Sequence, residues 1–157
     1  MILFLDVDGV LHPDPAPTRH YFCRLPLLEE ILMDYPKVEI VISSTWRLDW
    51  AEESEQIDGM KEHFSLALKN RIVGATPDHR RTPSSCAPSG LAGHLREWEC
   101  MDWLRTYRPA GTPYLMLDDR PWLFRPNNPH LMIVDCDDVF LPGNEAELRS
   151  RLASRCG

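Results

Sequence analysis

The apolar residues of this chain fall into short uninterrupted runs rather than into alternating patterns. A run of this kind is typical of a strand buried on both faces, as in a parallel sheet, whereas a sheet with one solvent face shows alternation. The runs that we interpret as strands are Ile2–Leu5, Val38–Ser43, Arg71–Gly74, Tyr114–Leu117 and Leu131–Val134.

Helical patterns separate these strands. Leu25–Tyr35 carries Pro26 in its first turn, where proline is tolerated, and Pro36 ends it. Leu91–Tyr107 repeats apolar residues at helical spacing. Further helical segments are predicted at Ala146–Ser154 and, with a break near Asp58-Gly59, over Trp46–Leu68. Strands that alternate with helices predict an α/β fold, a three-layer α/β/α Rossmann-like parallel sheet.

Two proline-rich segments interrupt this pattern. Pro13, Pro15 and Pro17 exclude a helix in residues 12–24, because proline lacks a backbone donor; we expect this segment to form a flap over the end of the first strand. Residues 75–90, rich in Pro, Ser and Thr, form either a mobile surface loop or a loop that faces a substrate. The length of 157 residues suits a single domain, 1–157.

Polar side chains stand where the predicted strands end. Asp6 and Asp8 follow the first strand, and Ser43 ends the second. Asp118 and Asp119 follow the strand at 114–117. Right-handed crossovers place the carboxyl ends of parallel strands on one edge of the sheet, so these groups are expected to converge. An Asp-x-Asp-Gly sequence also occurs as a solvated turn, but the buried strand before Asp6 favours a functional site.

Converging carboxylates predict phosphoryl chemistry with a metal ion. A hard, oxygen-rich cluster suits Mg²⁺, which is therefore the expected cofactor. A carboxylate beside such an ion can attack phosphorus, and a second acid can protonate the leaving oxygen. A hydroxyl and a cationic side chain would hold the phosphoryl oxygens.

Three motifs resemble the haloacid dehalogenase (HAD) superfamily over nearly the whole chain. Asp6-Val-Asp8-Gly9-Val10, the apolar strand ending in Ser43, and Leu117-Asp118-Asp119 are similar to its motifs one, two and four. The resemblance implies a HAD-like fold with no large cap domain, because the spacing of the motifs leaves no room for one. It implies Asp6 as the nucleophile that forms an aspartyl-phosphate and Asp8 as general acid and base. It implies that Ser43 hydrogen-bonds the phosphoryl group. Mg²⁺ would bind Asp6, the backbone carbonyl of Asp8, and Asp118 or Asp119. An Asp two positions after the nucleophile is typical of the family's phosphatases and phosphotransferases, not of its dehalogenases.

Motif three of that family is a basic residue at the start of the helix before motif four. No lysine occupies this region, and Arg96 is the candidate, with His94 as a second choice. Arginine can hold phosphate with bidentate geometry, but Arg96 could instead be a solvated helix residue that pairs with Glu99. The residues beside the motifs that we predict to bind substrate are Gly9, Ser44, Thr45 and Arg47.

Local resemblances suggest the substrate class. Ile42-Ser-Ser-Thr-Trp-Arg47 and Val73-Gly-Ala-Thr-Pro77 resemble the HAD domains of bacterial RNA-repair proteins, and Asp118-Asp119-Arg120 resembles the phosphatase domains of polynucleotide kinase-phosphatases. We therefore expect a Mg²⁺-dependent phosphohydrolase that acts on a phosphorylated small molecule, a nucleotide or a nucleic-acid end. Two alternatives stay open: a 3′ or 5′ nucleic-acid end phosphatase in repair, and a catalytically silent HAD-fold binding domain.

Composition narrows the partners and the location. The net charge of −7 argues against extended binding to nucleic acid or to an anionic membrane, although not against gripping one terminal nucleotide. No apolar run approaches the about 20 residues that span a bilayer, and the N-terminus does not resemble a signal peptide, so a cytoplasmic protein is expected. The five cysteines include no Cys-x-x-Cys pair, which excludes a zinc ribbon.

Two further side chains near the strand ends have undecided roles. His12 lies in the flap, where it could contact substrate, but it is expected to be a surface histidine. Trp46 follows the second strand and is expected in core or rim packing, with stacking on a nucleic-acid base as the alternative.

Overall fold

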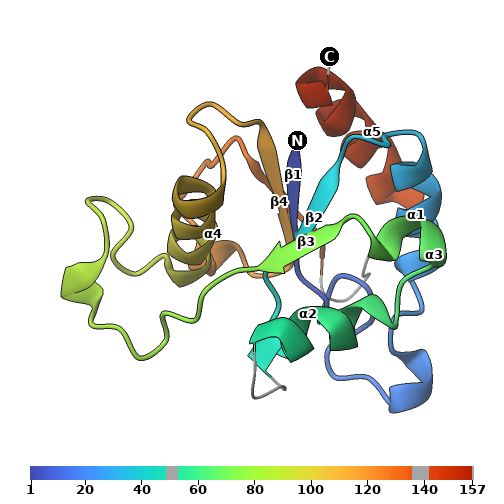
Figure 1. Ribbon diagram of the computed structural model, residues 1–157, viewed down its shortest axis with the longest axis horizontal. Helices are drawn as coiled ribbons and strands as arrows, with labels where there is room; N and C mark the ends of the chain where they lie inside the picture. Colours follow the sequence, from blue (N-terminus) through green and yellow to red (C-terminus); the bar gives the residue numbers. More distant parts are fainter. Residues whose placement is uncertain (49–52, 136–141, 157) are drawn as a thin grey trace.

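Five parallel strands form one sheet in the order β3-β2-β1-β4-β5 (Figure 1). The structure is a computed structural model, and it describes residues 1–48, 53–135 and 142–156. The strands are β1 (Ile2–Leu5), β2 (Glu39–Ile42), β3 (Ile72–Ala75), β4 (Tyr114–Asp118) and β5 (Leu131–Ile133). Every strand predicted from the apolar runs is present, and every pairing is parallel.

Helices cover both faces of this sheet. The helices are α1 (Leu25–Met33), α2 (Glu53–Lys61), α3 (Leu66–Lys69), α4 (Leu95–Tyr107) and α5 (Pro142–Cys156). Figure 1 shows α4 on one face and α1 and α5, which contact each other, on the opposite face. This arrangement confirms the predicted three-layer α/β/α architecture. No helix in the described ranges is both long and apolar enough to cross a membrane.

The strands bury side chains on both faces, which explains their uninterrupted apolar sequences. In β1, Leu3 and Leu5 belong to the core under α1 and α5, whereas Ile2 and Phe4 pack with residues of α4. All four residues are fully buried. Because side chains alternate along a strand, a strand with two buried faces cannot show a polar position.

Two helix boundaries differ from the sequence prediction. The break predicted near Asp58-Gly59 is wrong, because α2 continues to Lys61. Helix α4 begins at Leu95 instead of Leu91, since Gly93 has a φ of +86° that interrupts the helical geometry. Leu91 is still buried, so its spacing indicated burial but not helix. Residues 49–52, within a segment predicted as helical, lie outside the described residues.

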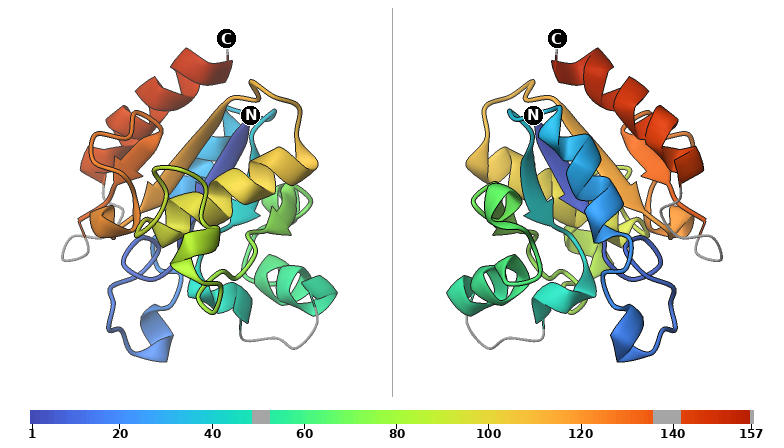
Figure 2. Two further views of the ribbon diagram at one scale, coloured as in Figure 1. Left: turned by 90° about the vertical axis from the view of Figure 1, so that its left-hand side faces the viewer. Right: turned by 90° about the vertical axis from the view of Figure 1, so that its right-hand side faces the viewer.

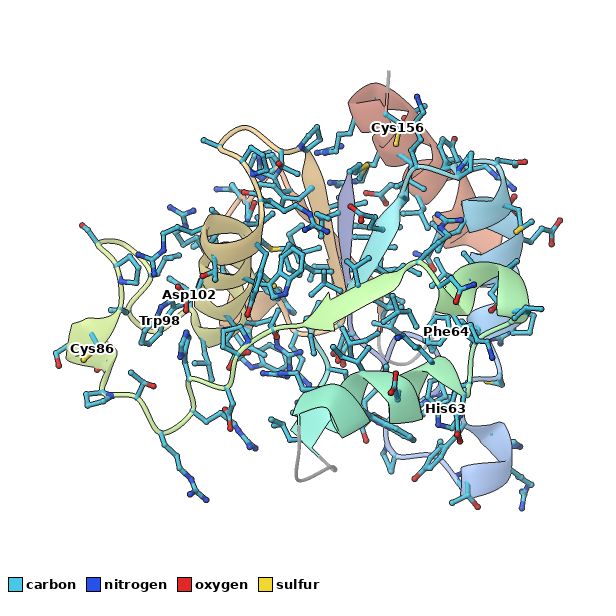
Figure 3. The ribbon with its side chains drawn as sticks, in the orientation of Figure 1. His63, Phe64, Cys86, Trp98, Asp102 and Cys156 are labelled. Carbon is cyan, nitrogen blue, oxygen red and sulfur yellow. The ribbon has the colours of Figure 1, made fainter. Side chains whose placement is uncertain are left out.

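The carboxyl end of the sheet is flanked by the flap (residues 12–24) and by α2. Both views in Figure 2 show the two segments at the end of the sheet opposite the chain termini. Aromatic contacts of Phe22 hold the flap in place. Its ring stacks on that of His63 at a centroid distance of 4.1 Å and lies edge-on to that of Trp46 at 5.1 Å. Figure 3 places His63 at the side of α2 next to the flap. Between β1 and α1 the chain forms only turns, an isolated bridge and the short helix Thr18–His20.

Candidate active site

The sheet topology brings together the residues that follow β1, β2 and β4. Strand β1 is central, and the chain order reverses between β1 and β4, where open parallel sheets bind ligands at the carboxyl edge. Asp6 follows β1, Ser43 follows β2, and Asp118 is the last residue of β4. All three are buried.

Three carboxylates form a compact cluster at this edge. Asp6, Asp118 and Asp119 each offer an oxygen within 4.8 Å of the others, and all three are buried. One Asp118 oxygen accepts a hydrogen bond from the backbone N–H of Arg120 at 2.9 Å. Asp118 Oδ2 and Asp119 Oδ1 are buried and lack a hydrogen-bond partner among the described residues. Unpartnered buried oxygens of this kind fit a hard divalent cation.

The electrostatics of the cluster favour a bound cation. Burial, together with the negative charge of Asp6, raises the pKa of Asp118 well above its ordinary value. The same two causes raise the pKa of Asp119 to about 6. Both raised pKa values mean that the folded state binds more protons than the unfolded state above pH 3.8, so the metal-free fold loses stability as the pH rises, for Asp119 between 3.8 and about 6.

Substitution of Asp118 with asparagine is expected to stabilise the metal-free protein. Removing one of three close like charges should raise the free energy of unfolding at pH 7 by about 1–3 kcal/mol. Mg²⁺ should raise the melting temperature of the wild type but not that of Asp118→Asn, since the variant loses a ligand. Thermal and urea unfolding with EDTA or Mg²⁺ measures both effects. A variant less stable than the wild type in EDTA would contradict this reading of the cluster.

Gly9 permits the approach of Asp119 to the cluster. Its φ is +72°, and a Cβ at this position would lie 2.3 Å from Asp119 Oδ2. The Gly9 N–H donates to the carbonyl of His12 at 2.9 Å. The structure therefore gives Gly9 a positioning role, whereas the sequence predicted that it binds substrate.

Asp8 is held apart from the cluster by two side chains. Its Oδ1 accepts hydrogen bonds from Trp46 Nε1 at 2.7 Å and from His12 Nε2 at 3.0 Å. The backbone N–H of Phe22 faces His12 Nδ1 at 3.4 Å, which assigns the imidazole proton to Nε2. Burial tends to raise the pKa of Asp8, but the hydrogen bonds from His12 and Trp46 outweigh it and lower that pKa. His12 is 2% exposed, so the prediction of a surface histidine is wrong.

Arg96 reaches the cluster from the first turn of α4. Its Nη1 lies 3.7 Å from Asp6 Oδ1, and its Nε lies 3.9 Å from Glu99 Oε2. The alternative of a solvated helix arginine is wrong, because the side chain is buried and Nη1 has no hydrogen-bond partner in the described part of the chain. A cation at a helix N-terminus is unfavourable because it opposes the helix dipole. The attraction of Asp6 and Glu99 therefore explains why Arg96 lies there.

Arg47 has a structural role, in contrast to the predicted substrate contact. Its Nε donates to the carbonyl of Thr76 and its Nη1 to the carbonyls of Ser43 and Ser44. Its Nη2 donates to the carbonyl of Pro77 and to Glu99 Oε2 at 2.8 Å. With all five N–H groups engaged, the guanidinium has no donor left for a ligand. It joins the ends of β2 and β3 to α4.

The hydroxyl residues after β2 divide into two environments. Ser43 is buried at the carboxyl edge of the sheet, and its backbone carbonyl accepts a hydrogen bond from Arg47 Nη1. Ser44 Oγ accepts from the backbone N–H of Trp46 at 3.4 Å. Thr45 lines a cavity of about 550 Å³ beside Asp8, together with Tyr21, Trp46, Leu48 and Arg80. A larger cavity of about 990 Å³ lies at the other end of α4 and contains none of the predicted site residues.

Sequence comparison places these motifs in a known family. A family model described as "HAD domain in Swiss Army Knife RNA repair proteins" matches residues 2–147. This match confirms the resemblance drawn from the motifs. Neither the curated proteins nor the solved structures contain a match.

Proposed function

The chain belongs to the family of HAD domains found in Swiss Army Knife RNA repair proteins, and on this basis we propose that it is a Mg²⁺-dependent phosphohydrolase that acts through an aspartyl-phosphate. Family membership indicates a phosphohydrolase-type function. The observation that carries the finer proposal is the buried cluster of Asp6, Asp118 and Asp119 beside Arg96. These carboxylates suit a metal ion and a nucleophile at one point.

The proposed metal site uses the unpartnered oxygens of the cluster. Asp6, Asp118, Asp119 and the backbone carbonyl of Asp8 would hold Mg²⁺. When bound, Mg²⁺ supplies positive charge that offsets the carboxylates and the phosphoryl oxygens. Arg96 and the Ser43 hydroxyl would hold the remaining phosphoryl oxygens, because both residues lie at the same edge of the sheet and Arg96 Nη1 has no hydrogen-bond partner among the described residues.

In the first step, an Asp6 carboxylate oxygen attacks phosphorus and the bond from phosphorus to the leaving oxygen breaks. The proton of Asp8 passes to that oxygen, and the alcohol departs. In the second step, water attacks the phosphorus of the aspartyl-phosphate while Asp8 accepts a proton from the water. Inorganic phosphate leaves, Asp6 is regenerated, and Asp8 is again protonated.

The position of Asp8 suits this double role. His12 and Trp46 fix its carboxylate without consuming the second oxygen, Oδ2, to which no described group donates. Its lowered pKa in the free protein favours the ionised form. A bound phosphate ester adds negative charge nearby, which raises the pKa of Asp8 and favours the acid form that the first step requires.

We expect Mg²⁺-dependent release of phosphate from a generic aryl phosphate, and its loss in EDTA. Asp8→Asn should slow the hydrolysis of alkyl phosphates about 100-fold or more. It should slow the hydrolysis of aryl phosphates with good leaving groups much less, because only a poor leaving group needs a proton. Steady-state phosphate assays across leaving groups measure this difference. Equal losses for both substrate classes would remove Asp8 from the role of general acid.

The two alternative functions make different demands on the same site. A catalytically silent binding domain would show no Mg²⁺-dependent turnover. Release of phosphate from an aryl phosphate would therefore exclude this alternative, and no release would support it. A nucleic-acid end phosphatase uses the proposed chemistry on a particular substrate, and the family's association with RNA repair proteins favours it.

A further inference from the structure

The cavity of about 550 Å³ lies where the leaving group of a phosphate ester must sit, because the proposed proton donor Asp8 lines it. Its volume falls within the about 300–1,000 Å³ that small-molecule pockets occupy. Resting on the phosphohydrolase function proposed above, we propose that this cavity binds the terminal nucleoside of a phosphorylated nucleic-acid end. Tyr21 would stack on the base and Arg80 would bind the next phosphate along the strand.

Tyr21 provides an oriented aromatic surface at the cavity. Its ring packs against the His12 imidazole at a centroid distance of 4.7 Å and edge-on to Trp46 at 5.2 Å. The residue is nevertheless 39% exposed, and no described group hydrogen-bonds its hydroxyl. A ring that is fixed on one side and open on the other is a stacking surface for any base. Trp46 is a weaker platform, because four other rings pack around its indole, those of His12, Tyr21, Phe22 and His63.

Arg80 provides one oriented cation on the cavity wall. Its Nε and Nη2 donate to the two carboxylate oxygens of Asp78 at 2.9 and 3.0 Å. The hydrogen bond from Arg80 lowers the pKa of Asp78 to about 2, so the pair stays ionised. Nη1 makes no hydrogen bond to a described residue, which leaves two N–H donors for a phosphate oxygen. Residues 75–90 therefore include a substrate-facing position.

The loop that carries Arg80 is fixed to α4 by its neighbour His79. The His79 ring stacks on Trp98 at 4.4 Å, and its Nε2 lies 3.0 Å from Asp102 Oδ2. Figure 3 shows Trp98 and Asp102 on the side of α4 that faces this loop. Arg80 is thus placed beside the site by the helix that supplies Arg96.

This combination of groups selects the substrate class. A sugar phosphate would leave the Tyr21 ring uncovered, and a nucleoside monophosphate would leave Arg80 without an anion. A nucleoside 3′,5′-bisphosphate is the smallest ligand that satisfies both, and a phosphorylated dinucleotide presents the same groups at a nucleic-acid end. The net charge of −7 opposes contacts along a longer strand, so recognition should end at the second phosphate.

Binding tests the pocket independently of turnover. In the Asp6→Asn background with Mg²⁺, calorimetry would measure the affinity for a phosphorylated dinucleotide. Tyr21→Leu and Arg80→Ala should each weaken binding about tenfold, and Tyr21→Phe should retain it. Matched controls are Tyr107→Leu, 54% exposed on α4, and Arg81→Ala, because neither residue lines the cavity. Unchanged affinity in Tyr21→Leu and Arg80→Ala, or equal losses in the controls, would overturn the proposal.

Turnover separates this proposal from the function on which it rests. Phosphorylated RNA and DNA dinucleotides, each with the phosphate at the 3′ or the 5′ end, should give at least tenfold higher kcat/KM than nucleoside monophosphates. Tyr21→Leu and Arg80→Ala should each reduce that ratio. Turnover without a preference for dinucleotides would overturn the pocket assignment and leave the phosphohydrolase intact. If no phosphate ester is turned over, the proposed function fails and the binding series alone decides the pocket.

Discussion

Replacing Asp6 with asparagine is expected to lower Mg²⁺-dependent phosphate release by about 1,000-fold or more, the scale found when a group that forms a covalent bond in the reaction is removed. An amide at this position cannot attack phosphorus. It also removes a negative charge from the cluster of Asp6, Asp118 and Asp119. The buried Arg96 keeps the charges of Asp118 and Glu99 beside it, so the fold should stay intact, with a melting temperature in EDTA no lower than that of the wild type.

The matched control for Asp6→Asn is Asp58→Asn. The Asp58 side chain is 75% exposed in α2 and pairs with Lys61 at the surface. This substitution makes the same chemical change far from the cluster, and it should preserve the rate. A wild-type rate in Asp6→Asn from a preparation free of contaminating phosphatase would remove Asp6 from the role of nucleophile.

Replacing Arg47 with methionine is expected to lower the free energy of unfolding by about 3–5 kcal/mol, the usual cost of removing one partner of a buried ion pair. The substitution removes the 2.8 Å partner of the buried Glu99, which keeps only Arg96 at 3.9 Å. It also removes the side-chain donor of four backbone carbonyls, of which that of Ser44 still accepts from the backbone N–H of residue 47. Urea unfolding followed by circular dichroism measures the loss, provided that the m-value is unchanged.

Arg105→Met is the matched control for Arg47→Met. Arg105 also pairs with a carboxylate of α4, Asp102, but its side chain is 80% exposed. A solvent-exposed pair of this kind contributes about 0–1 kcal/mol. Equal losses in the two variants would contradict the structural role assigned to Arg47.

The apolar pattern predicted the sheet because burial on both faces leaves a direct trace in sequence. Each strand of the sheet matches an uninterrupted apolar run. The parallel order of the strands then determines that Asp6, Ser43 and Asp118 lie at the same edge of the sheet. The positions of the main site residues follow from topology alone, since the carboxyl ends of parallel strands share one edge.

The first half of α4 could not be predicted in the same way. The apolar spacing of 91–107 predicts that Leu95 and Trp98 are buried; Trp98 is, but Leu95 is only partly buried. Arg96, Glu97 and Glu99 are also buried. A periodicity argument assigns charged residues to the solvent-exposed face of a helix. Their burial becomes favourable only through partners that lie far away in the sequence.

For a related reason, the sequence did not predict which side chains hydrogen-bond Asp8. His12 and Trp46 lie 4 and 38 positions from Asp8 in the chain, and no spacing rule links either residue to a carboxylate. The only sequence signal was their position next to a strand end, in segments that ring packing with Phe22 and His63 brings together.

The most direct test of the account is the location of the phosphoryl group during turnover. Acid quenching of the enzyme with an aryl phosphate and Mg²⁺, followed by peptide mapping, should find a hydroxylamine-sensitive phosphoryl adduct on Asp6. The adduct should be absent from Asp6→Asn and should accumulate in Asp8→Asn, in which water attack lacks its base. A phosphoryl group on any other residue, or turnover without an adduct on Asp6, would contradict the proposed mechanism.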